Sequence, residues 1–107
     1  MAVFVQQGSA VDYTPGAATP AGTVVVQGDL VGIVKHDIPA NKLGALAVEG
    51  VFDVEKEAAT VFAAGDKVYW DGLNLVAVTT ATGNKLMGKA VAAAGNGPTS
   101  VRVRLSQ

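Results

Sequence analysis

The stretch LAVEGVFDVE, residues 46–55, predicts the fold class more clearly than any other part of the chain. Four apolar residues occupy its even-numbered positions, and all three acidic residues occupy odd-numbered ones. The apolar positions are Leu46, Val48, Phe52 and Val54, and the acidic positions are Glu49, Asp53 and Glu55. Because side chains alternate between the two faces of a strand, this stretch predicts a half-buried strand. Gly50 has no side chain to pack and marks a point where that strand can bend.

Short runs of the same kind continue along the chain, separated by 13 glycines and four prolines. The C-terminal run SVRVRL, residues 100–105, alternates aliphatic residues with arginine, which is typical of a strand that buries one face. The candidate strands are residues 3–6, 10–14, 23–27, 30–35, 43–55, 67–70, 75–80, 85–92 and 99–106. Strands of this length and spacing predict an all-β fold, either a small β-sandwich or a partly open β-barrel of short antiparallel strands.

We expect one domain over residues 1–107, because no hinge-like composition divides the chain. Residues 1–8 are a candidate N-terminal arm of that domain. At most one short helix is expected, near residues 56–64, where alanine is frequent and Gly65 would end the helix.

The composition predicts a core of small side chains and a surface that is partly hidden. The chain has 18 valines and 18 alanines, and its only tryptophan, Trp70, is therefore the expected core anchor. Charged residues make up 16%, against about 25% in an average soluble domain, which favours a homo-oligomer, a dimer or a trimer. The net charge is −1 and the basic residues are scattered, so a nucleic-acid partner is not expected. No apolar run approaches the roughly 18 residues of a membrane span, and the chain should be made in the cytoplasm.

The segment GNKLMGKA, residues 83–90, matches the phosphate-binding loop pattern except at its last position. Ala90 stands where that pattern needs a hydroxyl to bind Mg²⁺. The flanking sequence also predicts a turn and a strand instead of a strand and a helix. A strand with Lys85 and Lys89 on its solvent face therefore explains the segment better than nucleotide binding does.

The remaining candidate groups also favour a structural interpretation. His36 is the chain's only histidine and there is no cysteine, so neither a transition-metal site nor a cysteine nucleophile is expected. The acidic residues of the central stretch alternate as solvation alone would require. Lys85, Lys89, Arg102 and Arg104 could form a basic stripe if the last two strands pair. We therefore predict no catalytic residues, no cofactor-binding residues and no metal site.

The segment AAGDKVYWDG, residues 63–72, concentrates charged and aromatic residues as an active site would. Asp71-Gly72 is nevertheless typical of a hairpin turn, and residues 67–70 are expected to form the strand that precedes this turn. The related segments VVQGDLVGI and FAAGDKVYW both place Gly-Asp before a strand, which leaves a biotinyl or lipoyl carrier barrel as an alternative. Such carriers present a lysine at a hairpin tip, whereas Lys67 is expected to enter a strand.

Three segments taken in order resemble the capsid cement, or head decoration, proteins of tailed phages and prophages. These are VGIVKHDIPANKLGALAVEGVFDVEK, AAGDKVYWDG and ATGNKLMGKAVAAAGNGPTSVRVRL. The resemblance covers nearly the whole chain, and its most specific parts are residues 49–52, 65–71 and 88–91. Members of this family sometimes carry a RecA/RadA-like recombinase label, which Ala90 contradicts.

The resemblance implies a non-enzymatic virion protein that binds the exterior of a phage head and stabilises it. Its partner would be the major capsid protein, and the family brings no catalytic residues. Val3, Phe4 and Val5 of the N-terminal arm are candidate contacts to the capsid or to another copy, because an exposed apolar end strand can add to another sheet. The carrier barrel, and more distantly a nucleotide-binding recombinase, remain the alternatives.

Overall fold

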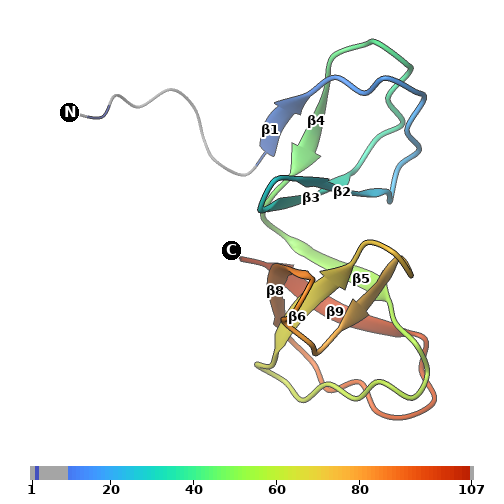
Figure 1. Cartoon of the computed structure of the whole chain (residues 1–107), viewed down its shortest axis with the longest axis vertical. Helices are drawn as coiled ribbons and strands as arrows, with labels where there is room; N and C mark the ends of the chain where they lie inside the picture. The colour runs from blue at the N-terminus through green and yellow to red at the C-terminus, as the bar shows by residue number, and fades with distance from the viewer. Residues whose placement is uncertain (1, 3–9, 107) are drawn as a thin grey trace.

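Nine β-strands in two antiparallel sheets make up the computed structural model, which describes residues 2 and 10–106 (Figure 1). The first sheet contains, in spatial order, β1 (Ala10–Tyr13), β4 (Gly44–Ala47), β3 (Leu30–Val34) and β2 (Val24–Gln27). The second contains β5 (Val51–Glu55), β9 (Ser100–Leu105), β8 (Lys85–Ala90), β6 (Lys67–Asp71) and β7 (Val76–Val78). The described residues form no helix, and the expected all-β fold of short antiparallel strands is confirmed.

The second sheet curls without closing into a barrel. Its two edge strands, β5 and β7, approach each other, and Lys56, the residue after β5, forms an isolated parallel bridge with Ala77 of β7. The first sheet packs against the second through Val24, Val31 and Ile33, and the segment after β4 connects the two sheets (Figure 1). The architecture is therefore two packed sheets, one of them strongly curved.

The single strand predicted over residues 43–55 is in fact two strands in different sheets. β4 ends at Ala47 and β5 begins at Val51. Gly50 between them has φ +113°, a conformation that side-chain-bearing residues rarely adopt, and there the chain leaves one sheet for the other. The predicted alternation holds within β5, where Val54 is buried and its neighbours Asp53 and Glu55 are exposed.

Residues 56–64 form turns and isolated bridges because their backbone groups pair with distant strands and loops. The Lys56 N–H donates to the carbonyl of Thr99 at 2.9 Å. Phe62 and Ala94 exchange both backbone hydrogen bonds, each at 2.9 Å, and the Phe62 side chain is buried. These long-range bonds use donors and acceptors that a helix would have needed, so tertiary pairing overrides the local preference of the alanines.

β3 joins the two halves of the hydrophobic core because both of its faces are buried. Val31 and Ile33 pack into the main core between the sheets, whereas Val34 packs with Leu46 and Ile38 in a smaller core. The members of the main core that come from the second half of the chain are Val54, Phe62, Val68, Trp70, Ala77, Met87, Ala90, Ala94, Val101, Val103 and Leu105. One strand thus contributes to both cores, and a single domain over residues 1–107 stays a prediction.

Candidate interaction surfaces

The phosphate-loop-like segment is a turn followed by β8, and its second glycine has a structural role. A Cβ on Gly88 would collide with the backbone carbonyl of Arg104 on the adjacent strand β9. Lys89 is exposed and lies directly across from Arg104. Because β8 continues through Ala90 where a phosphate loop would begin a helix, the pattern reflects close strand packing.

The stretch around Trp70 forms the hairpin of β6 and β7, with a loop capped by carboxylate hydrogen bonds. Asp71 accepts from the backbone N–H of Leu73 at 2.9 Å and from Asn74 Nδ2 at 2.8 Å. These bonds lower the pKa of the Asp71 carboxyl, and the bond from the Asn74 side chain has the largest effect. Asp66 similarly accepts from the Ala63 N–H at 2.8 Å. Both carboxylates of residues 63–72 therefore have structural partners in turns.

The tip of this hairpin carries apolar side chains into solvent. Leu73 is 95% exposed and Leu75 is 60% exposed. Leu75 also has φ +58°, which is uncommon for a leucine and is held by its N–H bond to the Asp71 carbonyl at 2.8 Å. A lysine is not present in this loop, and Lys67 begins β6 instead of standing at the tip that a carrier barrel would use.

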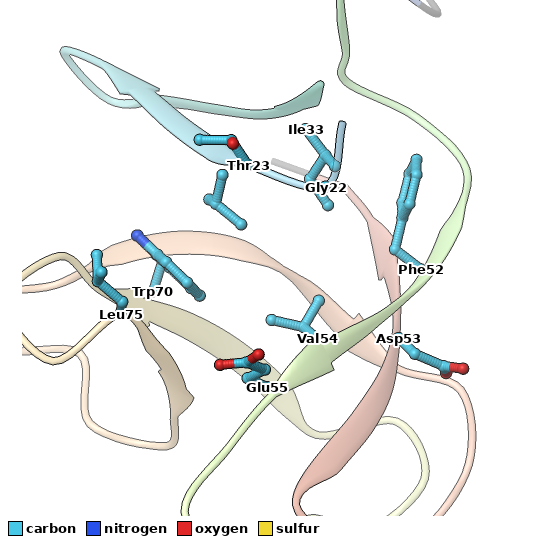
Figure 2. A pocket seen from close by; sticks show the side chains of 10 residues that line it. Gly22, Thr23, Ile33, Phe52, Asp53, Val54, Glu55, Trp70 and Leu75 are labelled. Carbon is cyan, nitrogen blue, oxygen red and sulfur yellow. The ribbon is translucent and has the colours of Figure 1, made fainter. Parts of the chain in front are cut away.

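A groove of about 390 Å³ lies between the two sheets beside this hairpin. Figure 2 shows Val54 and Trp70 from the second sheet facing Ile33 from the first, with Phe52 at one end and Leu75 at the other. Asp53 points away from the groove, and Glu55 lies at its rim (Figure 2). Most of the lining is apolar, with Thr23, Asp53 and Glu55 as its polar residues, so the groove suits an aliphatic or aromatic side chain of a partner.

Trp70, the expected core anchor, is 7% exposed and belongs to the main core. Its ring also forms part of the groove lining, so Trp70 contacts both the main core and the groove between the sheets. The energetic weight of this ring stays a prediction. Val3, Phe4 and Val5, the candidate contact residues, lie outside the described residues.

Lys56 is the one charged residue that is buried in the described part of the chain, and the sequence analysis missed it. It is 3% exposed, and its Nζ donates to the backbone carbonyls of Thr60 at 2.7 Å and Gly95 at 3.0 Å. Longer bonds reach the carbonyls of Glu57 at 3.2 Å and Ala58 at 3.4 Å. The lysine thus ties together two loops at one end of the second sheet. The signal was its position, since residue 56 continues the inward-facing series of residues 52 and 54.

His36 and Asp37 lie at a surface hollow of about 580 Å³ over the first sheet. Both are exposed, and Asp37 Oδ1 accepts a hydrogen bond from the Ala21 N–H at 2.7 Å. This bond ties two loops together and gives the carboxylate a structural role. Within residues 2 and 10–106, no group of three or more histidine, cysteine, aspartate or glutamate residues is placed so that it could hold a metal ion.

The prediction that Lys85 and Lys89 share the solvent face of one strand is wrong for Lys85. A register irregularity opposite Val68 and Tyr69 interrupts the alternation of β8, and Lys85 reaches across to the first sheet, where its Nζ lies 2.6 Å from Asp29 Oδ1. β8 and β9 are neighbouring strands, and Lys89 lies directly across from Arg104. The bulge could not be deduced from the period-2 pattern, which assigns Lys85 and Lys89 to the same face.

The solvent face of the second sheet, here called the outward face, carries Lys67, Lys89, Arg102 and Arg104. Arg102 pairs across the strands with Asp53, Nε to Oδ1 at 3.0 Å. This pairing lowers the pKa of the Asp53 carboxyl, chiefly through the hydrogen bond from Arg102. The charged residues of the outward face are Asp53, Glu55, Lys67, Asp71, Lys89, Arg102 and Arg104, and its exposed valines are Val51 and Val91.

Comparison with known proteins identifies one family. The model of the phage cement protein family matches residues 5–105. No curated protein and no solved structure matches. In the described residues, no helix is long and apolar enough to cross a membrane.

Proposed function

Since the chain belongs to the phage cement protein family, a family of structural capsid proteins and not of enzymes, we propose that it binds the outer surface of an assembled phage head and stabilises the shell. The family match over residues 5–105 carries this proposal. The partner would be the major capsid protein, and the protein would reside on the exterior of the virion after synthesis in the host cytoplasm. Binding needs no catalytic group, which agrees with the structural roles of Asp66, Asp71 and Gly88.

Stabilisation follows from preferential binding to the assembled shell. A ligand that binds the assembled form and not the separated subunits shifts the equilibrium toward assembly. If the protein is a dimer or a trimer, as we propose, several weak footholds combine into lasting attachment. Exposed apolar side chains support an interface of this kind; the largest are Val26, Leu43, Val51, Val61, Leu73, Leu75 and Val91.

The N-terminal arm supplies part of this contact in our proposal. Residues 3–9 directly precede β1, which is an edge strand of the first sheet. An apolar segment that includes Val3, Phe4 and Val5 can add as a strand to the sheet of a neighbour. Deletion of residues 2–7 should weaken head binding, and unchanged co-sedimentation with heads would refute a role for the arm.

The proposed function is tested with purified protein and heads that lack it. The protein should sediment with the heads, should saturate at a fixed number of copies per head, and should raise the temperature at which heads release DNA. Separated capsid subunits are the control, because they should bind less protein than assembled shells do. Failure to sediment with any heads of the phage that encodes it would contradict the proposal.

A further inference from the structure

Three basic residues form a row across three neighbouring strands of the outward face. Lys67 of β6 lies directly across from Lys89 of β8, and Lys89 lies directly across from Arg104 of β9. All three are exposed. We call Lys67, Lys89 and Arg104 the cation row.

The cation row is unfavourable for the isolated molecule. Like charges directly opposite each other on neighbouring strands destabilise a sheet. The chain does pair cations elsewhere, Lys85 with Asp29 and Arg102 with Asp53. Within the described residues, no such ion pair is formed by the members of the cation row. The fold therefore concentrates positive charge at a place where its own carboxylates do not neutralise it.

The charge of the whole outward face is opposite to that of the rest of the chain. The face carries four basic residues and three acidic ones, Asp53, Glu55 and Asp71, which give a formal charge of +1. The remainder then holds four basic and six acidic residues, a formal charge of −2, within a chain of net charge −1. Such segregation orients a protein as it approaches a charged surface and gives specificity for the binding orientation.

Apolar groups flank the cation row, as expected of a docking surface more than of a purely solvated face. Val51, 54% exposed, lies directly across from Arg104, and Val91, 45% exposed, directly follows β8, two residues after Lys89. Apolar contacts surrounded by charges allow a partner to gain burial energy while the charges fix its orientation.

We propose that the outward face is the surface that docks on the phage head, and that the cation row binds carboxylates exposed on the capsid exterior. This inference rests on the proposed function and names the side of the protein that faces the shell. The first sheet, the groove beside Trp70 and the apolar hairpin tip would then point away from the bound patch or toward neighbouring copies.

The test compares two double variants that change the net charge equally. Lys67→Gln/Lys89→Gln removes two members of the cation row, and Lys35→Gln/Lys42→Gln removes two exposed lysines of the first half of the chain. Binding to heads is measured by co-sedimentation over a range of protein concentrations and at low and high salt. Urea denaturation of each variant shows whether it is folded.

The cation-row variant should be at least as stable as the original protein, because a like-charge repulsion is removed. Its half-saturating concentration for heads should rise by about tenfold, whereas the control variant should bind within about twofold of the original. Added salt should weaken the binding of the original protein to heads more than it weakens the binding of the cation-row variant.

Equal binding by the cation-row variant and the control would overturn the inference while leaving the proposed function intact. If the original protein fails to bind heads at all, the proposed function fails and the inference fails with it. Binding of bare double-stranded DNA through Lys67 and Lys89, at concentrations that give head binding, would also overturn it, since the partner would then be phosphate and not capsid carboxylate.

Discussion

Replacing Lys56 by methionine tests whether the buried ammonium holds the second sheet and its loops together. The substitution keeps an unbranched side chain of similar length but removes the donor to the carbonyls of Thr60 and Gly95, which accept at 2.7 and 3.0 Å. Hydrogen bonds to charged groups contribute about 1.5–3 kcal/mol each, so these two bonds are worth about 3–6 kcal/mol in favour of the fold.

Part of that stabilisation is offset, because burying the ammonium costs several kcal/mol that methionine does not pay. The carbonyls cannot be removed together with the lysine, however, since they belong to the backbone of residues 57–60 and 95. They would remain without that donor, and since Thr60 is half-buried and Gly95 exposed, water can satisfy them in part, so the cost stays below the roughly 1–3 kcal/mol of a fully buried unsatisfied group. We therefore expect Lys56→Met to lower the free energy of unfolding by about 3 kcal/mol.

The free energy of unfolding is measured by urea denaturation with Trp70 fluorescence, because Trp70 is the only tryptophan and lies in the core. Lys42→Met is the control, since Lys42 is exposed and its change should cost less than about 0.5 kcal/mol. The urea midpoint of Lys56→Met should fall at an unchanged m-value. A loss below about 1 kcal/mol would refute the argument and would mean that water replaces the lysine without penalty.

Three further perturbations test the core, the strand packing and the surface ion pairs. Trp70→Ala should cost about 3–5 kcal/mol in urea denaturation, and a loss below about 1 kcal/mol would mean that the ring contributes mainly to an interface. Gly88→Ala should cost more than about 2 kcal/mol, because its Cβ meets the Arg104 backbone; an unchanged thermal midpoint would show that the two strands can separate freely. Asp29 and Asp53 have pKa values lowered from 3.8, mainly by the hydrogen bonds from Lys85 and Arg102, so their contribution is present above 3.8 and is lost as the pH falls through the lowered values. Stability should accordingly fall with acid below about pH 4, and an Asp53→Asn variant should show a shallower fall; identical acid profiles would contradict this assignment.

The strand pattern could be predicted from sequence where one face of a strand is buried and the other exposed. β5 and β9 alternate in this way: Val54, Val101, Val103 and Leu105 are in the core, and Phe52 packs against it. Val51 does not follow the pattern, because it is apolar and exposed. The same alternation runs through Gly50 and does not reveal that the chain changes sheets there. β3 gives no alternation at all, because both of its faces are buried.

The candidate surfaces depend on pairings between segments that are distant in sequence. Lys67 and Lys89 become neighbours only through the register of β6 with β8, and the irregularity beside Tyr69 moves Lys85 away from them. Period-2 reasoning applies to one strand at a time and cannot detect a bulge. Lys56 is different, because a lysine at an inward-facing position is visible in the sequence and could have been singled out.

Imaging of heads with and without the protein tests the central claim most directly. Heads from a phage that lacks the gene would be reconstructed by cryo-electron microscopy before and after addition of the purified protein. We predict new density on the outer surface at regularly repeated positions, with the second sheet and its cation row facing the shell. Absence of added density, or density confined to the interior of the shell, would contradict the assignment as an exterior cement protein.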